Sequence, residues 1–128
     1  MDPQAKGKRI LVVEDETPLR DLYVEILKEQ GYEVDSASEG ETALSKMKAG
    51  GYNLVLLDLI MPKMDGLEVL EKLKADPSII PNKSIVILTN VGHDGAIAKG
   101  VGLGATGYLV KMDYTPDKLL EEIKNYIK

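Results

Sequence analysis

The run Leu54-Val55-Leu56-Leu57 is continuously apolar and is followed at once by a carboxylate, Asp58. Four adjacent apolar residues are typical of a strand that is buried on both faces of a parallel sheet. Similar runs occupy residues 10–13, 85–88 and 108–110. Residues 33–37 alternate polar and apolar side chains instead, which indicates a strand at the edge of the sheet.

Amphipathic segments separate these five strands, and apolar residues recur in them at helical spacing. Thr17-Pro18 and Thr115-Pro116 each have the pattern of an N-cap followed by proline at the first helical position. The predicted helices run from Thr17-Pro18 to Gly31, over residues 40–49, past Leu67, Leu70 and Leu73 to just before Pro77, over residues 93–103, and from Thr115-Pro116 onward. The fourth helix contains three glycines, so we expect it to be the least stable element.

Five strands that alternate with five helices specify a parallel sheet covered on both faces, because parallel strands need crossover connections. We therefore predict an α/β fold of the flavodoxin-like, doubly wound kind, with strand order 2-1-3-4-5. The domain is predicted to span residues 8–128, after a polar N-terminal tail over residues 1–7. Ligands in such sheets bind beyond the carboxyl ends of the strands, near the point where the winding reverses, which here lies between the first and third strands.

The composition excludes several classes of protein. The 128 residues include no Cys, which excludes disulfides and Cys nucleophiles and favours a cytoplasmic location. The net charge is −5, whereas nucleic-acid-binding surfaces are usually basic, so no direct nucleic-acid binding is expected. No apolar run approaches the ~20 residues of a membrane span, so no membrane partner is expected either.

Polar side chains follow four of the five predicted strands. They are Glu14 and Asp15 after the first strand, Asp58 after the third, Thr89 after the fourth and Lys111 after the fifth. The carboxyl ends of parallel strands meet at one edge of a sheet, where three neighbouring carboxylates would raise one another's pKa. A compensating cation is therefore expected. Mg²⁺ fits, because it prefers oxygen ligands and commonly binds through one or two carboxylates while it keeps waters for a phosphate.

Four segments resemble the signatures of a single family. Residues 58–66 (DLIMPKMDG) resemble the phosphoacceptor loop of response-regulator receiver domains, and residues 13–16 (VEDE) resemble their acidic pair. Residues 88–90 (LTN) and 107–111 (GYLVK) resemble the two remaining signatures. Order and spacing agree from Lys8 onward, so nearly the whole chain is similar to receiver domains of the chemotaxis-regulator-like superfamily of two-component signalling.

The resemblance implies a set of roles around Asp58. This residue would be the nucleophile that takes a phosphoryl group from a phosphohistidine of a sensor histidine kinase or phosphotransfer protein. Asp15, Asp58 and the backbone carbonyl of Ile60 would bind Mg²⁺ directly, while Glu14 would act mostly through water. Mg²⁺ is the cofactor that the resemblance implies.

The resemblance also assigns the parts of a switch. Lys111 would contact the phosphoryl group as a point charge, Thr89 would donate a hydrogen bond to it, and Tyr108 would change its packing as Thr89 moves. The chain would then be no enzyme but a phosphoacceptor switch that catalyses only its own phosphorylation and dephosphorylation. Its output would go to an unidentified downstream protein, and it would be a monomer or a weak dimer.

Two positions depart from the pattern of the family. Met112 follows Lys111 where proline is usual, often after a cis peptide bond, and Asn90 follows Thr89 where a small residue is common. A cis bond before a residue other than proline costs about 2.5–4 kcal/mol. The Lys111-Met112 peptide is therefore predicted to be trans.

Two further side chains bear on the lifetime of a phosphorylated state. By resemblance, Ile60 and Val91 flank the path by which water would approach the phosphorus atom. Both are apolar and β-branched, so neither can orient a water molecule by hydrogen bonding. Slow self-dephosphorylation is the expected result.

Two alternatives keep the same fold. A flavodoxin-type electron carrier would need a hydroxyl- and glycine-rich phosphate loop after the first strand, whereas residues 14–17 (EDET) would repel a phosphate; a yellow purified protein would favour this alternative. A degenerate receiver would only scaffold partners, and the presence of Asp15, Asp58, Thr89 and Lys111 argues against it. Residues 102–107 match the dinucleotide fingerprint G-x-G-x-x-G but lead into a strand, so we predict a turn there.

Overall fold

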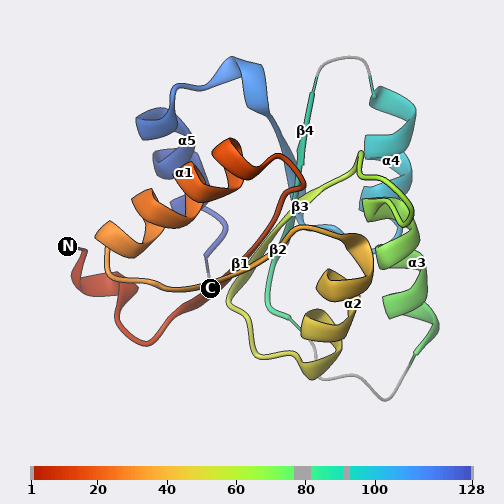
Figure 1. Ribbon diagram of the computed structural model, residues 1–128, viewed down its shortest axis with the longest axis horizontal. Coiled ribbons are helices and arrows are strands. Elements are labelled where there is room, and N and C mark those ends of the chain that lie inside the picture. The colour runs from red at the N-terminus through yellow and green to blue at the C-terminus, as the bar shows by residue number, and fades with distance from the viewer. Residues whose placement is uncertain (1, 77–81, 91–92, 128) are drawn as a thin grey trace.

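The computed structural model describes residues 2–76, 82–90 and 93–127, and it contains one parallel sheet in the order β2-β1-β3-β4-β5 (Figure 1). The strands are β1 (Arg9–Val13), β2 (Glu33–Ala37), β3 (Leu54–Asp58), β4 (Ile85–Thr89) and β5 (Gly107–Val110). The helices between and after them are α1 (Thr17–Glu29), α2 (Gly40–Ala49), α3 (Gly66–Ala75), α4 (Asp94–Gly102) and α5 (Pro116–Lys124). The predicted doubly wound α/β fold and its strand order are confirmed.

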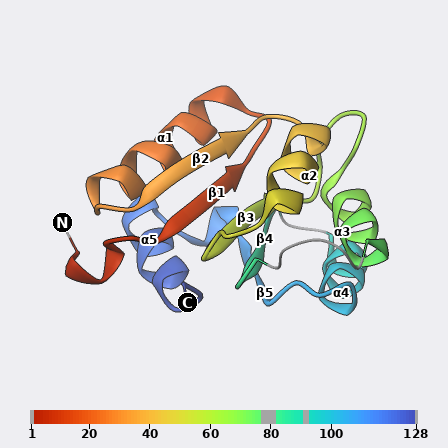
Figure 2. The same cartoon turned by 90° about the horizontal axis from the view of Figure 1, so that it is seen from below.

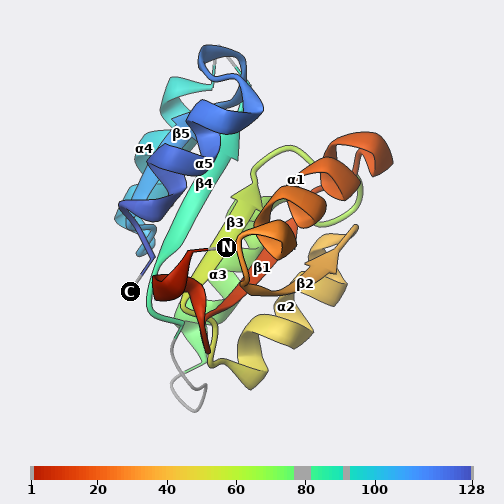
Figure 3. The same cartoon turned by 90° about the vertical axis from the view of Figure 1, so that its left-hand side faces the viewer.

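The sheet lies between two layers of helices. Helices α1 and α5 cover one face, and α2, α3 and α4 cover the other (Figure 2), while Figure 3 looks onto the α1 and α5 side. Successive residues of β3 point to opposite faces: Leu54 and Leu56 pack in the α1 and α5 layer, and Val55 and Leu57 pack against the other three helices. Both faces of β3 are buried, which explains its uninterrupted apolar sequence.

The register of the sheet aligns the carboxyl ends of four strands. Val13 pairs with Leu57 at the ends of β1 and β3, and Thr89 pairs with Val110 at the ends of β4 and β5. The residues that follow these pairs therefore emerge at one edge. Strand β2, predicted as an edge strand, pairs with β1 alone in the described sheet.

The two predicted Thr-Pro helix starts differ in the structure. Thr115 caps α5 as predicted, and its hydroxyl accepts a hydrogen bond from the backbone N–H of Lys118 at 3.4 Å. The prediction for Thr17 is wrong, because Glu16 is the N-cap of α1 and Thr17 is already helical. The physical reason lies in the backbone: the carbonyl of Glu16 accepts the first intrahelical hydrogen bond, from the N–H of Arg20 at 2.9 Å, so the helix begins one residue earlier.

Part of the predicted polar tail packs against the domain. Pro3–Ala5 forms a short 3₁₀ helix, and Ala5 is fully buried in the apolar cluster beneath α1 and α5. The backbone N–H of Asp2 donates to the carbonyl of Gln30 at 2.9 Å, and its carboxylate lies 3.4 Å from Nζ of Lys124. These contacts tie the segment to the C-terminal ends of α1 and α5.

The three glycines of α4 differ in how much space surrounds them. Gly100 is closely packed, since a Cβ there would lie 2.4 Å from Cδ1 of the buried Ile87, whose side chain would have to shift. Gly95 and Gly102 face open space, with no atom within 4 Å of a Cβ at either position. The helix spans Asp94–Gly102, one residue shorter at each end than the predicted 93–103.

Gly95→Ala and Gly102→Ala are each expected to stabilise the folded protein by about 0.5–1 kcal/mol, because alanine restricts the unfolded chain and has room in the helix. Amide hydrogen exchange of α4 should slow in both variants, and in the parent α4 should exchange faster than α1. Gly100→Ala is the matched control and should destabilise the protein by collision with Ile87. Equal protection of α4 and α1 in the parent would contradict the low stability that we assign to α4.

Three further sequence predictions concern the backbone and the membrane. Residues 102–107 form the predicted turn, in which Gly104 adopts φ of 113° between α4 and β5. The described ranges contain no cis peptide bond, so the Lys111-Met112 peptide is trans, as predicted. Within these ranges, no helix has the length and apolar character needed to cross a membrane.

Candidate functional site

Two acidic residues leave the end of β1 and are held there through their backbone. Glu14 is almost fully buried and its N–H donates to the carbonyl of Ala37 at 3.1 Å, while Asp15 is partly exposed. Nη1 of Arg20, one turn into α1, donates to the carbonyl of Glu14 at 3.0 Å and to that of Asp15 at 3.5 Å. The guanidinium of Arg20 therefore holds the backbone of Glu14 and Asp15 in place just after β1.

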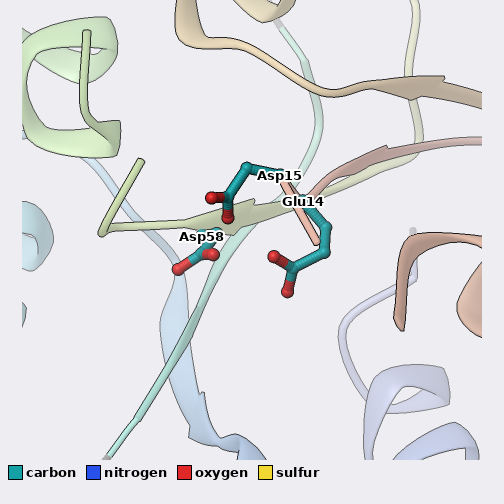
Figure 4. A group of neighbouring side chains, drawn as sticks. All are labelled: Glu14, Asp15 and Asp58. Atoms are coloured by element: carbon teal, nitrogen blue, oxygen red, sulfur yellow. The ribbon is translucent and has the colours of Figure 1, made fainter. Parts of the chain in front are cut away.

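Asp58, the last residue of β3, completes a group of three carboxylates. Its side chain is buried, and Oδ1 accepts a hydrogen bond from the N–H of Ile60 at 3.2 Å. One carboxylate oxygen from each of Glu14, Asp15 and Asp58 lies within 4.8 Å of the others. Figure 4 shows the three side chains converging beyond the ends of β1 and β3.

Lys111, which directly follows β5, reaches the same group of carboxylates. Nζ of Lys111 lies 2.5 Å from Oε1 of Glu14 and 3.2 Å from Oδ2 of Asp58. All three side chains are largely buried. Lys111 begins the short 3₁₀ segment Lys111–Asp113, so β5 delivers the ammonium group to the carboxylates of β1 and β3.

Burial and charge act together on these groups. Burial, followed by the negative charge of Glu14, raises the pKa of Asp58 to about 7 against the opposing charge of Lys111. Burial also opposes ionisation of Glu14, but hydrogen bonds, first that from Lys111, outweigh it and lower the pKa of Glu14. Burial disfavours the Lys111 ammonium, yet the bond to Glu14 and the charge of Asp58 raise its pKa. Glu14 and Lys111 therefore form the ion pair, and Asp58 is the member that protonates readily.

Comparison with known proteins identifies the arrangement. The family model of the response regulator receiver domain matches residues 10–124. The chain belongs to this family. It is a receiver domain of two-component response regulators, as the resemblance of its motifs predicts, and the flavodoxin-type alternative is set aside.

Similar sequences cover this receiver domain almost completely. The chemotaxis protein CheY of Treponema pallidum is 36% identical in an alignment of 129 positions that covers 98% of this chain and 87% of that protein. A probable transcriptional regulator, ycf27, of Cyanophora paradoxa is 37% identical over 94% of this chain but only 48% of its own length. The chain thus spans about half the length of several of its relatives, among them a second ycf27 protein from Porphyridium aerugineum.

Solved structures agree with the fold of this receiver domain. The response regulator protein TrrA of Thermotoga maritima, in a complex with Mg²⁺ and BeF, has a TM-score of 0.76 and 39% identity, covering 94% of this chain and 99% of that one. A CheY-like receiver domain protein from Methanospirillum hungatei has a TM-score of 0.78 and 34% identity, covering 92% and 91%.

The donor set fits a hard divalent cation. Three carboxylates converge on one point, and Asp15 and Ile60, which is 52% exposed, leave that side of the site open to solvent. Oxygen ligands with room for water are what Mg²⁺ requires. The single ammonium of Lys111 does not balance three ionised carboxylates, and burial together with the negative charge of Glu14 raises the pKa of Asp58 in spite of it. The site can hold a metal ion, with Glu14, Asp15 and Asp58 as the acidic ligands.

The two predicted switch residues lie on neighbouring strands, two positions apart in the register of β4 and β5. Thr89, at the end of β4, is fully buried, and its hydroxyl donates to the carbonyl of Asn90 at 3.2 Å. Tyr108, on β5, is 49% exposed and lines a hollow of about 470 Å³ with residues of α4, including Ile97 and Val101. Thr89 therefore belongs to the edge that carries the acids, whereas the Tyr108 ring lies against α4.

Two contacts of the site were missed by the sequence analysis. Arg20 donates to the backbone of the acidic pair. The available signal was its position one turn into the first helix, from which a long side chain can reach the residues before that helix. Gly66 begins α3 so close to the phosphoacceptor candidate that a Cβ would lie 2.4 Å from the carbonyl oxygen of Asp58. A glycine at the first position of a helix, following the Asp65 cap, was the available signal. Val91, the second residue assigned to the water path, lies outside the described residues.

Without a divalent ion, the free energy of unfolding is expected to fall as the pH rises from about 4 to about 7. The pKa of Asp58 is 3.8 in an ordinary environment and about 7 in the folded protein, so the folded state binds the proton more tightly. The stability from that proton is complete below the ordinary pKa and is lost as the pH passes the raised value.

Urea denaturation across this pH range measures the effect. The Asp58→Asn variant is the control, because it keeps the shape of the side chain and removes its titration, so its stability should fall less. Glu14, whose pKa is lowered against its burial by hydrogen bonds with Lys111 and then with Asp58, contributes with the opposite sign, so the difference between the two proteins reports Asp58 together with its coupling to Glu14. Parallel curves for the parent and the variant would contradict the raised pKa.

Proposed function

We propose that this receiver domain is a phosphorylation-operated switch in which Asp58 accepts a phosphoryl group from a phosphohistidine of a sensor kinase or phosphotransfer protein. The observation that carries the proposal is the placement of the buried Asp58 carboxylate, 3.2 Å from the Lys111 ammonium and within one group with Glu14 and Asp15. These groups come from three different strands, and a purely structural role would not need three carboxylates at one edge of the sheet.

The chemistry is an in-line transfer between two nucleophiles. An oxygen of ionised Asp58 forms a bond to phosphorus as the bond from phosphorus to the donor's ring nitrogen breaks, and that nitrogen keeps the electron pair. Bound Mg²⁺ supplies neutralisation of the charge on the phosphoryl oxygens. Lys111, which pairs with Glu14 in the unphosphorylated protein, would turn its ammonium to a phosphoryl oxygen.

The response would begin at Thr89. Its buried hydroxyl donates to the Asn90 carbonyl in the unphosphorylated protein, and it can donate instead to a phosphoryl oxygen. Movement of Thr89 toward the phosphoryl group would leave space at the end of β4, and Tyr108 would move inward from its half-exposed position. The face formed by α4 and β5 would thereby change shape for a downstream protein.

The family of this receiver domain indicates the kinds of partner that the switch would have. Receiver domains act with histidine kinases and downstream targets in two-component systems. The chain would act in the cytoplasm as a monomer or weak dimer and would bind no nucleic acid itself, consistent with its net charge of −5. It would be no enzyme toward an external substrate, since the reactions it promotes occur on its own Asp58.

The test is incubation with a small phosphodonor with and without Mg²⁺, followed by intact mass measurement. We expect one added phosphoryl group with Mg²⁺ and far less without it. A protein that gains no phosphoryl group in either condition, although folded and able to bind Mg²⁺, would be a scaffold with the receiver fold and not a phosphoacceptor.

A further inference from the structure

Gly40, the first residue of α2, lies against the backbone of the loop that follows Asp58. A Cβ on residue 40 would lie 2.2 Å from the carbonyl oxygen of Met64 and 2.9 Å from its carbonyl carbon and Cβ. Gly40 is buried, and its φ does not fall in the left-handed region. The close approach of two backbones therefore requires glycine here, and the backbone conformation does not.

The loop of residues 60–65 has few ties beyond its own neighbourhood. Its hydrogen bonds within the described chain are local: Ile60 N–H donates to Asp58, Met64 N–H donates to the Pro62 carbonyl at 2.8 Å, and Asp65 accepts from the first turn of α3. Lys63 adds a left-handed backbone, with φ of 67°. The shape of the loop is thus set internally, but its position relative to the rest of the domain depends on packing.

The contact partner on the other side, α2, is held firmly. Ala43, Leu44 and Met47 bury their side chains in the apolar cluster beneath α2, α3 and α4. Nζ of Lys46 donates to Oδ1 of Asp35 and to the carbonyl of Ser36, each at 2.8 Å, which fastens the helix to β2. An added side chain at the start of α2 would therefore displace the loop more readily than the helix.

We propose that Gly40 is a positioning residue for the metal site: its missing side chain lets α2 set the place of the loop that carries the Ile60 carbonyl. The atoms nearest to a Cβ on residue 40 all belong to Met64, so Gly40 acts through that loop residue and is not itself one of the proposed metal ligands. The inference rests on the proposed function, because it assumes that the loop helps to bind Mg²⁺. Helix α2 contributes no residue to the acidic group, but through this contact it would fix the position of the loop beside that group.

The test is the affinity of the unphosphorylated protein for Mg²⁺, measured by isothermal titration calorimetry on Gly40→Ala. We expect the affinity to fall roughly tenfold or more, the scale seen when groups that orient metal ligands are lost. Two controls separate placement from general destabilisation. Gly95→Ala adds the same methyl group in open space and should bind Mg²⁺ as the parent does, and Leu44→Ala weakens the packing of α2 and should lower stability without lowering affinity.

Each outcome decides something. Gly40→Ala that folds and binds Mg²⁺ as the parent does would overturn the inference, and so would an equal loss of affinity in Leu44→Ala. If Gly40→Ala does not fold, the same substitution is made in a protein that also carries the stabilising changes Gly95→Ala and Gly102→Ala. Failure to fold there as well would show that Gly40 is needed for folding and not for the placement of the loop. A parent protein that binds no Mg²⁺ would instead refute the proposed function itself.

Discussion

Asp58→Asn is expected to abolish the gain of an acid-stable, base-labile phosphoryl group from a small donor in the presence of Mg²⁺. The carboxylate is the attacking group, and an amide in its place cannot form the acyl phosphate. The loss should exceed the roughly hundredfold effects expected for groups that only orient the reaction, because the nucleophile itself is removed. Intact mass spectrometry over time measures it.

The comparison needs a variant that changes charge without changing the nucleophile. Asp113→Asn removes one exposed carboxylate near the site and should be phosphorylated at the rate of the parent. Asp58→Asn should remain folded, since asparagine keeps the shape of the side chain and removes a buried charge whose pKa is raised. If Asp58→Asn still gains the phosphoryl group at the normal rate, another residue is the acceptor and the assignment of Asp58 is wrong.

The sequence predicts the fold well because local and long-range signals agree. The four residues before Asp58 are all apolar, and β3 is buried on both faces, so the continuous apolar run was sufficient to predict a buried strand. The polar residues after the strands were also informative, because the topology brings strand ends together at one edge. Glu14, Asp15, Asp58 and Lys111 form one group as expected.

What the sequence could not predict depends on contacts that are made only in the folded chain. Thr17 has the sequence of a helix cap, but the carbonyl of Glu16 accepts the first intrahelical bond, and no local pattern fixes a helix start to within one residue. The buried place of Ala5 within a polar segment depends on a gap beneath α1 and α5 that exists only after folding. The close approach at Gly40 likewise joins segments that are far apart in the chain, so its glycine looked like an ordinary helix start.

The side chain of Ile60 bears on how long a phosphorylated state would last. Its N–H donates to Asp58, so its backbone is fixed beside the acceptor, while its side chain is 52% exposed at the mouth of the site. Hydrolysis of an acyl phosphate needs a water molecule in line with the bond that breaks. A β-branched hydrocarbon at that mouth can obstruct the water and has no atom with which to orient it.

We therefore expect Ile60→Asn to shorten the lifetime of the phosphorylated protein by one to two orders of magnitude, roughly 1.4–2.8 kcal/mol on the barrier. The decay is followed by intact mass after removal of the donor, with Mg²⁺ in excess. Two control variants separate obstruction of the water from its orientation. Ile60→Val keeps the branched side chain and should decay as the parent does. Ile60→Ala opens the path without supplying a hydrogen-bonding group. Acceleration by Ala equal to that by Asn would assign the slow decay to obstruction alone, and faster decay in Asn than in Ala would add orientation of the water. If neither Ala nor Asn decays faster than the parent, the side chain of residue 60 does not set the lifetime, and the cause must lie elsewhere around Asp58.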